Sequence, residues 1–394
     1  MSLRIRRCRH LLIEPRERVA LDLAALLNGG DSLVAEQAWI ALAAHLDEEV
    51  ELDPAELAAL GAAPLQAWTD GTAFSATHGE GVVERLLDSG LLLSEPPRRE
   101  EANRRDTELR ELHWWTPAAV THARSRWSGV DAERGDNGAP GSVEAMIERF
   151  GAPPPELVSL REPAQRTPLP MPSASALSDL LSRRMSCRNF DAATALGLDD
   201  LGGILHRVFG VQGRHELAPG AVALKKGSPS GGGLHPLEAY LLVQRVDGIA
   251  PGLYHYHAGD HALEPMGRPD DGAALASAFV AGQPWFADAP VLVAICARFW
   301  RHQWKYRNHP KAYRVLHLEA GHFSQTLFLA AAERDLGAFI TAAINEHAVE
   351  QAFGLSPGAD GPLAVCGFGA RAARMETFEL DPNHRVWPEG SGAA

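Results

Sequence analysis

The spacing of hydrophobic positions divides this sequence into a leading part with a mostly helical pattern and a second part in which helices and strands alternate. In the leading part, apolar residues recur at helical spacing over Ser32–Leu46, which predicts a helix. The pair Asp53 and Pro54 marks the start of a second helix that ends near Gly61.

A third helix is predicted over Gly79–Gly90, and the apolar run Leu91–Leu93 follows it at once. A helix, a glycine cap and an edge strand in this order are typical of the end of a winged helix-turn-helix. Such folds bind DNA or peptides. The alternative interpretation is a small helical cap that stabilises the larger domain.

In the second part, helical and strand-like segments alternate, which indicates an α+β or α/β domain. One predicted helix, Tyr313–Gly337, is apolar on more than one side, so we expect it in a large core or at a subunit interface. The other helices are predicted at 176–184, 198–210 and 274–283. The strands are predicted at 239–246, in a hairpin at 252–266, at 290–299 and at 362–372.

Two stretches rich in glycine and proline separate the parts, at Asp131–Ser142 and at Gly151–Ser175. We therefore predict an N-terminal domain over residues 1–130 and a linker over 131–175. The second domain then spans 176–385, and residues 386–394 form a flexible tail.

Charge and cysteine content narrow the class of protein. The formal net charge of −13 disfavours a broad nucleic-acid or anionic-membrane surface. Cys8, Cys187, Cys296 and Cys366 form no C-x-x-C pair, so we expect neither a zinc knuckle nor a disulfide framework. The apolar run near the N-terminus is too short for a signal peptide, and no segment reaches the length of a membrane helix. These features predict a soluble, cytoplasmic protein with reduced thiols.

Arg184, Ser186 and Arg188 alternate at the start of the second domain. In an extended segment, two guanidinium groups and a hydroxyl would converge on one small anion, and a phosphate monoester suits the donor fork of arginine. The alternative is a solvated face, or arginines paired with nearby carboxylates.

A second motif is the side-chain-poor loop Pro229–Gly233, which precedes a strand. Consecutive glycines let a backbone come close to a flat ligand, and Ser230 adds a hydroxyl. The loop fits neither a nucleophile elbow, because Pro229 stands where the serine should be, nor a P-loop.

Lys305 and Tyr306 follow a predicted buried strand and stand among aromatic residues. Desolvation there would lower the pKa of the lysine and make it a usable base, whereas the alternative is a surface lysine beside a packing tyrosine. His255, His257 and His261 stand close together, but we expect no carboxylate or thiolate at ligand spacing and therefore no metal site.

Taken together and in this order, these segments resemble the SagB-type dehydrogenase branch of the flavin-dependent nitroreductase superfamily, over roughly Ala176–Arg374. The resemblance rests on R-x-S-x-R, P-S-x-G-x-L-H-P, G-L-Y-x-Y, W-K-Y-R and L-E-A-G-H-x-x-Q. It implies an α+β sandwich, with a central sheet flanked by helices, that forms an intertwined homodimer with FMN at the interface.

The resemblance also implies roles for individual residues. Arg184, Ser186 and Arg188 would hold the FMN phosphate and ribityl, with Arg371, or Arg374 in its place, as a further phosphate contact. The remaining cofactor residues would be the ring-contacting loop of Pro229, Ser230, Gly231 and Gly232, together with Gln325, Gly337 and Ala338. Lys305 and Tyr306 would transfer protons.

The implied reaction is the oxidation of azoline rings in a ribosomally made peptide to thiazoles or oxazoles. The implied partners are the precursor peptide, a second copy of the chain and a cyclodehydratase or other modifying enzyme, whereas no nucleic acid or membrane is expected. Three alternatives stay open: a reductase of dehydroamino acids or of nitro or quinone compounds that uses NAD(P)H, a flavin-bearing regulator that binds DNA, and an inactive partner of a synthetase complex. A winged helix in the leading part could hold a leader peptide, and its acidic charge suits a basic one.

Overall fold

The computed structural model describes residues 3–21, 33–134 and 142–391. It divides into two compact units, which are described separately here. Unit 1 comprises Met1–Arg126, Arg298–Val315 and Ser356–Gly361, and unit 2 comprises Trp127–Ala297, Leu316–Leu355 and Pro362–Ala394. Two short segments from late in the chain therefore group with the N-terminal residues.

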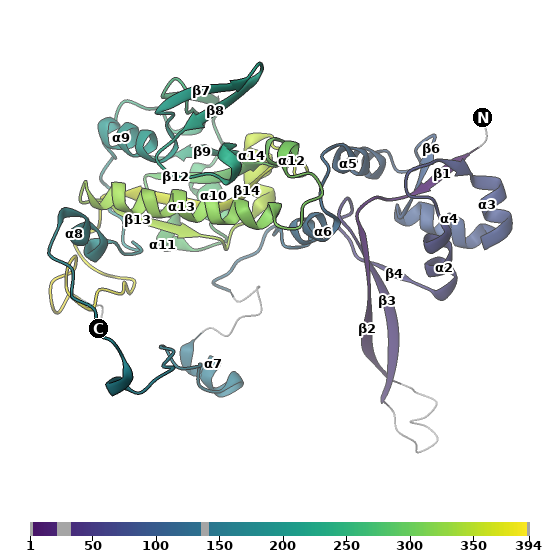
Figure 1. Ribbon diagram of the computed structural model, residues 1–394, viewed down its shortest axis with the longest axis horizontal. Coiled ribbons are helices and arrows are strands. Elements are labelled where there is room, and N and C mark those ends of the chain that lie inside the picture. Colours follow the sequence, from purple (N-terminus) through teal and green to yellow (C-terminus); the bar gives the residue numbers. More distant parts are fainter. Residues whose placement is uncertain (1–2, 22–32, 135–141, 392–394) are drawn as a thin grey trace. The chain divides into compact units, whose positions relative to one another are not determined.

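Unit 1 contains two small antiparallel sheets and a set of short helices (Figure 1). The strand order is β5-β1-β6 in one sheet and β2-β3-β4 in the other. The strands are β1 (Arg4–Arg7), β2 (Leu11–Leu21), β3 (Leu33–Ala43), β4 (Val50–Leu52), β5 (Thr69–Asp70) and β6 (Leu92–Glu95). The helices are α2 (Pro54–Ala62), α3 (Gly71–His78), α4 (Glu80–Ser89), α5 (Glu100–Glu111), α6 (Thr116–Arg124) and α12 (Phe299–Lys305).

The helix predicted over Ser32–Leu46 is wrong. Ser32 lies outside the described residues, and Leu33–Ala43 forms strand β3, which pairs with β2 from Leu11↔Ala43 to Leu21↔Leu33. The segment is rich in alanine and fits a helix by local propensity. Pairing with a strand earlier in the chain overrides that weak local preference, which helical spacing alone does not reveal.

The other two helices predicted in the N-terminal part, and the strand after the second of them, are confirmed. Helix α2 begins at a capping box in which Asp53 accepts from the Glu56 amide and Glu56 accepts from the Asp53 amide. Helix α4 ends at Gly90, whose φ of 80° is left-handed, and β6 follows as an edge strand. The helix, the glycine cap and the edge strand on which the winged-helix interpretation depends are thus present. The third strand of this sheet is β1, which precedes them in the chain.

Unit 2 is an α+β domain built around a six-stranded sheet of order β11-β10-β9-β12-β14-β13. Its predicted helices and strands are confirmed, except that the helix predicted over Tyr313–Gly337 ends at Ala332 and Gly337 begins strand β13. The strands are β7 (Gly213–Ala218), β8 (Ala221–Lys225), β9 (Leu237–Val243), β10 (Gly252–His257), β11 (Ala262–Gly267), β12 (Val291–Arg298), β13 (Gly337–Thr341) and β14 (Asp360–Gly369). The helices are α7 (Val143–Phe150), α8 (Ala176–Arg183), α9 (Leu198–Phe209), α10 (Gly272–Phe279), α11 (Pro284–Ala287), α13 (Ala312–Ala332) and α14 (Glu346–Phe353).

Every residue from Val291 to Ala297 of β12 is buried, which shows that both faces of the central sheet are covered at this strand. One face packs in a cluster with apolar residues of α10, α11 and α14. The long helix α13 runs along the sheet in Figure 1 and places Phe323 edge-on against Phe209 of α9, with ring centroids 5.1 Å apart. Leu318 of the same helix is 59% exposed, so α13 is buried on one side and open on another.

Histidines on β10 and at its turn have carboxylate neighbours, which corrects the expectation that none stands near. His255 Nδ1 lies 2.6 Å from Glu264 Oε2 and its Nε2 lies 3.9 Å from Glu238 Oε2, while His257 pairs with Asp260. Among residues 3–21, 33–134 and 142–391, no group of three or more acidic, histidine or cysteine side chains is arranged to hold a metal ion. No helix within these ranges is long and apolar enough to cross a membrane.

We predict that Phe323→Ala lowers the free energy of unfolding by about 3–5 kcal/mol, because it removes a fully buried ring from the contact between α13 and α9. Urea denaturation measures this loss. Leu318→Ala on the exposed side of α13 is the matched control and should change stability by less than about 0.5 kcal/mol. Equal losses in the two variants would contradict the packing described for α13.

The acids beside His255 give a second prediction. Glu238, with help from Glu264 and against the effect of burial, raises the pKa of His255 above its ordinary value of 6.5. Protonated His255 therefore stabilises the fold fully below pH 6.5, and this contribution is lost as the pH rises through the raised value. Urea denaturation of His255→Gln should show a larger loss in mildly acidic than in alkaline buffer. His215→Gln on exposed β7 should show no such trend, and a pH-independent loss for His255→Gln would exclude the ion pairs as its cause.

Candidate functional site

The segment after α8 is extended, as the alternation of Arg184, Ser186 and Arg188 requires. The ψ angle of Arg184 is 116°, and Ser186 forms a parallel bridge with Ala338 of β13. Met185 and Cys187 are 6% and 0% exposed, whereas the three polar residues between and beside them are half-buried. The guanidinium groups and the hydroxyl therefore lie on one side of the segment, opposite the core.

Gly337 allows this segment to lie close to β13. A Cβ atom at Gly337 would come within 2.4 Å of Cys187 Sγ, so any side chain there would push the two segments apart. The Cys187 amide donates to the Ala338 carbonyl at 2.8 Å, and Phe190 forms an antiparallel bridge with Arg371. The structure thus brings Arg184–Arg188, Gly337–Ala338 and Arg371 together from three separate stretches of sequence.

The arginines in this region differ in their partners. Arg371 donates to buried Glu379 at 2.6 Å, and Arg183 pairs with Asp179 and Asp335. Within the described parts of the chain, neither Arg184 nor Arg188 forms an ion pair with a carboxylate. The Arg184 guanidinium instead lies 5.4 Å from the centroid of the Phe328 ring. Two half-buried cations without counter-ions are suited to an external anion.

Glu379 anchors the C-terminal segment to the residues around Arg188 and Arg371 through hydrogen bonds. Its carboxylate is 1% exposed and accepts from the Arg188 and Asn189 amides, from the Asn189 side chain and from Arg371 Nη1. It also accepts from the indole N–H of Trp387, which lies in the predicted tail and is only 6% exposed. Arg374 is exposed. Arg371 is therefore positioned by a buried acid that stands only eight residues further along the chain.

The glycine-rich loop docks on α13. Ser230 Oγ donates to Glu319 Oε2 at 2.7 Å, and the hydroxyls of Ser228 and Thr326 lie 2.8 Å apart. Gly232 and Gly233 have φ angles of 63° and 70°, in the left-handed region that favours glycine. The loop therefore combines a fixed attachment to a helix with a backbone that carries no side chains.

Helix α13 contacts both the glycine loop, Pro229–Gly233, and the segment Arg184–Arg188, which we call the arginine segment. At about 100° per residue, Thr326 lies on the same face as Glu319 and Phe328 lies on the opposite face. Leu318 and Gln325 fall between these faces, and both are exposed. The exposed side of α13, with Gln325 on it, is thus bordered by the glycine loop on one side and by Arg184 on the other.

Sequence analysis missed Glu319. It is 1% exposed, and burial raises its pKa to about 7 while Ser230, the Gly231 amide and Lys226 act in the opposite direction. Lys226 is itself only 2% exposed. The available signal was positional, because Glu319 stands next to the apolar stripe of α13 that includes Leu316 and Phe323. A carboxylate at such a position must be buried or must interrupt the packing.

Lys305 and Tyr306 belong to unit 1, whereas every predicted cofactor residue belongs to unit 2. Lys305 ends α12 with its Nζ 5.7 Å from the Tyr306 ring centroid, and the Tyr306 ring lies 4.9 Å from that of buried His302. The sequence analysis expected nearby aromatic residues to bury Lys305. In the structure of this chain its side chain is exposed instead. The pair is adjacent and accessible, as a proton-transfer role requires.

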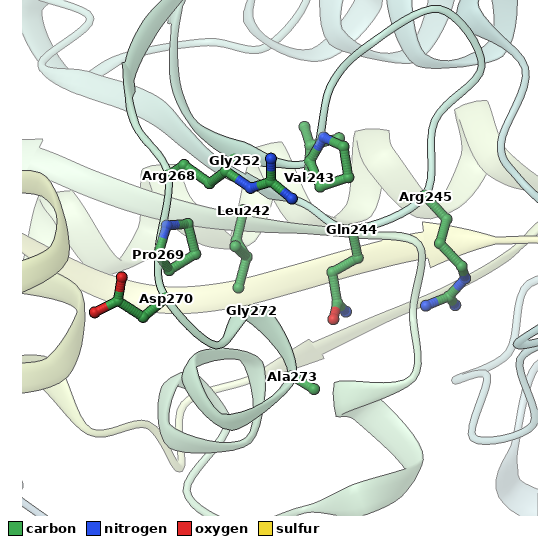
Figure 2. A pocket seen from close by; sticks show the side chains of 11 residues that line it. Leu242, Val243, Gln244, Arg245, Gly252, Arg268, Pro269, Asp270, Gly272 and Ala273 are labelled. Carbon is green, nitrogen blue, oxygen red and sulfur yellow. The ribbon is translucent and has the colours of Figure 1, made fainter.

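A separate cavity of about 240 Å³ lies beside β9 and β10 and includes none of the predicted site residues. In Figure 2, Arg268 and Asp270 lie on one side of it, and Gln244 and Arg245 lie on the other. Gln244 donates to the Ala287 and Ala289 carbonyls, so this polar side chain serves the fold. A second cavity of similar size is lined by Arg183, Arg371 and Arg385 and adjoins the arginine segment.

We predict that Glu379→Ala lowers the free energy of unfolding by about 3–5 kcal/mol, because it leaves Arg371 and several N–H donors buried without their acceptor. Glu379→Gln keeps the shape and should lose less. Chemical denaturation measures both, with exposed Glu376→Ala as the matched control. A loss no larger than that of the control would show that Glu379 does not fasten this segment.

Comparison with known proteins identifies the domain that contains these segments. The sequence profile of the nitroreductase family matches residues 181–370. A Methanocaldococcus jannaschii protein named as a nitroreductase is 29% identical over 175 residues, which cover 44% of this chain and 82% of that protein. The trifolitoxin-processing protein TfxB of Rhizobium leguminosarum bv. trifolii is 31% identical over 137 residues, which cover 34% of this chain and only 36% of TfxB.

A solved structure has a similar fold. A chain of the E. coli microcin synthetase McbBCD complex, with truncated pro-MccB17 bound, superimposes with a TM-score of 0.51 at 21% identity. The match covers 68% of this chain and 97% of that one. Residues 181–370, which contain Arg184–Arg188, the loop Pro229–Gly233, α13 and Gly337–Ala338, therefore match the nitroreductase family and lie in a domain with a similar fold.

Proposed function

We propose that this protein is an FMN-dependent oxidoreductase of the SagB type that matures a ribosomally made peptide by oxidising azolines to thiazoles or oxazoles. The observation that carries the proposal is the pair of half-buried arginines, Arg184 and Arg188, which form no ion pair within the described residues although acids neutralise their neighbours. A bound phosphate monoester would supply the missing charge.

The residues that surround α13 fit FMN in character. Arg184, Ser186 and Arg188 would hold the phosphate and ribityl, with Arg371, or Arg374 in its place, as a further contact. The ring would lie along Pro229–Gly232, near Gly337, Ala338 and Gln325. The fit rests on two features of the chain. Arg184 and Arg188 are half-buried and form no ion pair with a carboxylate of the described residues, and the loop backbone at Gly232 and Gly233 carries no side chains that would keep a flat ligand away.

The chain's own part in the reaction is to place the azoline and to move its protons. Lys305 would remove the proton from Cα of the azoline and return it to solvent, and Tyr306 would hold the ring nitrogen or relay the proton. When bound, FMN supplies the acceptor for the hydride that leaves Cβ, with dioxygen as the final oxidant. Formation of an aromatic ring favours the overall change, so the protein need only orient the ring and supply the base.

Two comparisons support a peptide as the substrate. TfxB is named for the processing of trifolitoxin, and the McbBCD structure is described as a synthetase with a truncated pro-peptide bound. Unit 1 would act as a winged helix that holds a leader peptide, which is supported by helix α4, its glycine cap and the edge strand β6. A second copy of the chain and a cyclodehydratase or similar enzyme would complete the assembly, in the cytoplasm.

We predict that the purified chain binds FMN and that Arg184→Ala weakens FMN binding at least about tenfold, because one charge-assisted contact to phosphate is lost. Lys305→Ala should keep FMN but lower azoline oxidation by about a hundredfold or more, as the loss of a general base does. Fluorescence titration and a peptide oxidation assay measure these effects. Arg268→Ala, an exposed arginine of the same unit, is the matched control.

The outcomes separate this function from its alternatives. A colourless chain that FMN does not reconstitute would refute the flavin site. Rapid reduction of the bound flavin by NADPH without peptide would favour the reductase of nitro, quinone or dehydroamino-acid substrates. Specific DNA binding at moderate salt would favour the regulator, and full turnover by the Lys305 variant would leave that lysine without a catalytic role.

A further inference from the structure

Glu319 is a buried acid that directly holds the backbone of the glycine loop. Ser230 Oγ donates to Glu319 Oε2 at 2.7 Å and accepts from the His235 amide at 2.8 Å. Ser230 therefore bridges the acid and the far end of the loop. The Gly231 amide also acts on the Glu319 carboxylate and lowers its pKa, against the effect of burial.

The loop between these contacts adopts conformations that need support. Gly232, Gly233 and His235 all have positive φ, and the value of 44° at His235 is uncommon for a residue with a side chain. Such conformations persist where the surroundings over-determine them. The hydrogen bond from the His235 amide to Ser230 Oγ is one of the restraints, and Ser230 is itself fixed by Glu319.

The carboxylate is also incompletely satisfied. Glu319 is 1% exposed, and its Oε1 atom accepts no hydrogen bond from the described residues. Lys226, before the loop, is the cation that favours the ionised carboxylate. The nearest imidazoles along the chain belong to buried His235 on the loop and exposed His322 on α13. A buried acid with one satisfied and one unsatisfied oxygen can hold or release a proton without changing its packing.

We propose that Glu319 is a positioning residue that sets the backbone of Gly231–Gly233 through Ser230 and that holds this loop more tightly when it is ionised. An ionised acceptor forms a stronger hydrogen bond with the Ser230 hydroxyl than a neutral one does, and it is favoured by the nearby Gly231 amide. The inference rests on the proposed function, in which this loop lies against the flavin. It assigns to Glu319 no contact with substrate or cofactor.

Ionisation of Glu319 has the opposite effect on the stability of the whole fold. Burial raises the pKa of Glu319 from its ordinary value of 4.5 to about 7, so the native protein binds the extra proton between these values. The contribution of Glu319 to stability is fully present below pH 4.5 and is lost as the pH rises through about 7. Ionisation should therefore tighten the loop while it lowers global stability.

The first test measures amide exchange of His235 in the full chain without added FMN. Glu319→Ala and Ser230→Ala should both lose the protection of this amide at least about tenfold, because each removes the restraint on the Ser230 hydroxyl. Glu319→Gln should retain most of it. Thr326→Val, which removes a hydroxyl from the same face of α13, should leave the His235 amide protected. Unchanged protection in Glu319→Ala would overturn the proposal.

The second test titrates FMN into the wild type and Glu319→Gln on either side of pH 7. The ratio of the two affinities cancels the titration of the FMN phosphate itself. This ratio should rise about threefold or more in favour of the wild type as the pH passes about 7. Lys226→Met should shift the rise to higher pH, because the cation that favours ionised Glu319 is gone.

The two tests fail in different ways. A ratio that does not change with pH would overturn the role of Glu319 ionisation even if FMN binds well. If the wild type binds no FMN, the proposed function fails, and the exchange measurement still decides whether Glu319 sets the loop.

Discussion

The close contact between the arginine segment and β13 is the constraint on which the rest of the candidate site depends. Ser186 pairs with Ala338, and Cys187 occupies the space that a side chain at Gly337 would need. This contact fixes the segment as an extended strand. Because alternate residues of a strand face opposite sides, burying Met185 and Cys187 turns Arg184, Ser186 and Arg188 the other way.

Charge then distinguishes the arginines that stabilise the fold from those that remain for a ligand. The protein is acidic overall, and buried Glu379 neutralises Arg371 while Asp179 and Asp335 neutralise Arg183. Arg184 and Arg188 lack such partners among the described residues. A net charge of −13 therefore says little about the site, since the local arrangement of acids decides where positive charge is left over.

Much of unit 2 follows from local sequence, whereas the parts that depend on distant partners do not. The apolar run at Val291–Ala297 and the helical spacing around Phe323 predict their elements correctly, because burial imposes each pattern directly. Strand β3 was not predicted from its local pattern, because its pairing with β2 decides its conformation. The alternation of Arg184, Ser186 and Arg188 correctly predicted that their side chains lie on one side of an extended segment. Glu379 and Glu319 were missed. The position of Glu319 beside an apolar stripe indicates burial, but only the fold shows which donors each acid meets.

The central claim is that the unpaired arginines bind the phosphate of FMN. The most direct measurement compares the affinities of the wild type and of the Arg184→Ala/Arg188→Ala double variant for FMN and for riboflavin, which lacks the phosphate. The wild type should prefer FMN to riboflavin by at least about tenfold, and the double variant should lose most of that preference. An equal preference for FMN in both proteins would contradict the claim, because the phosphate would then be bound elsewhere.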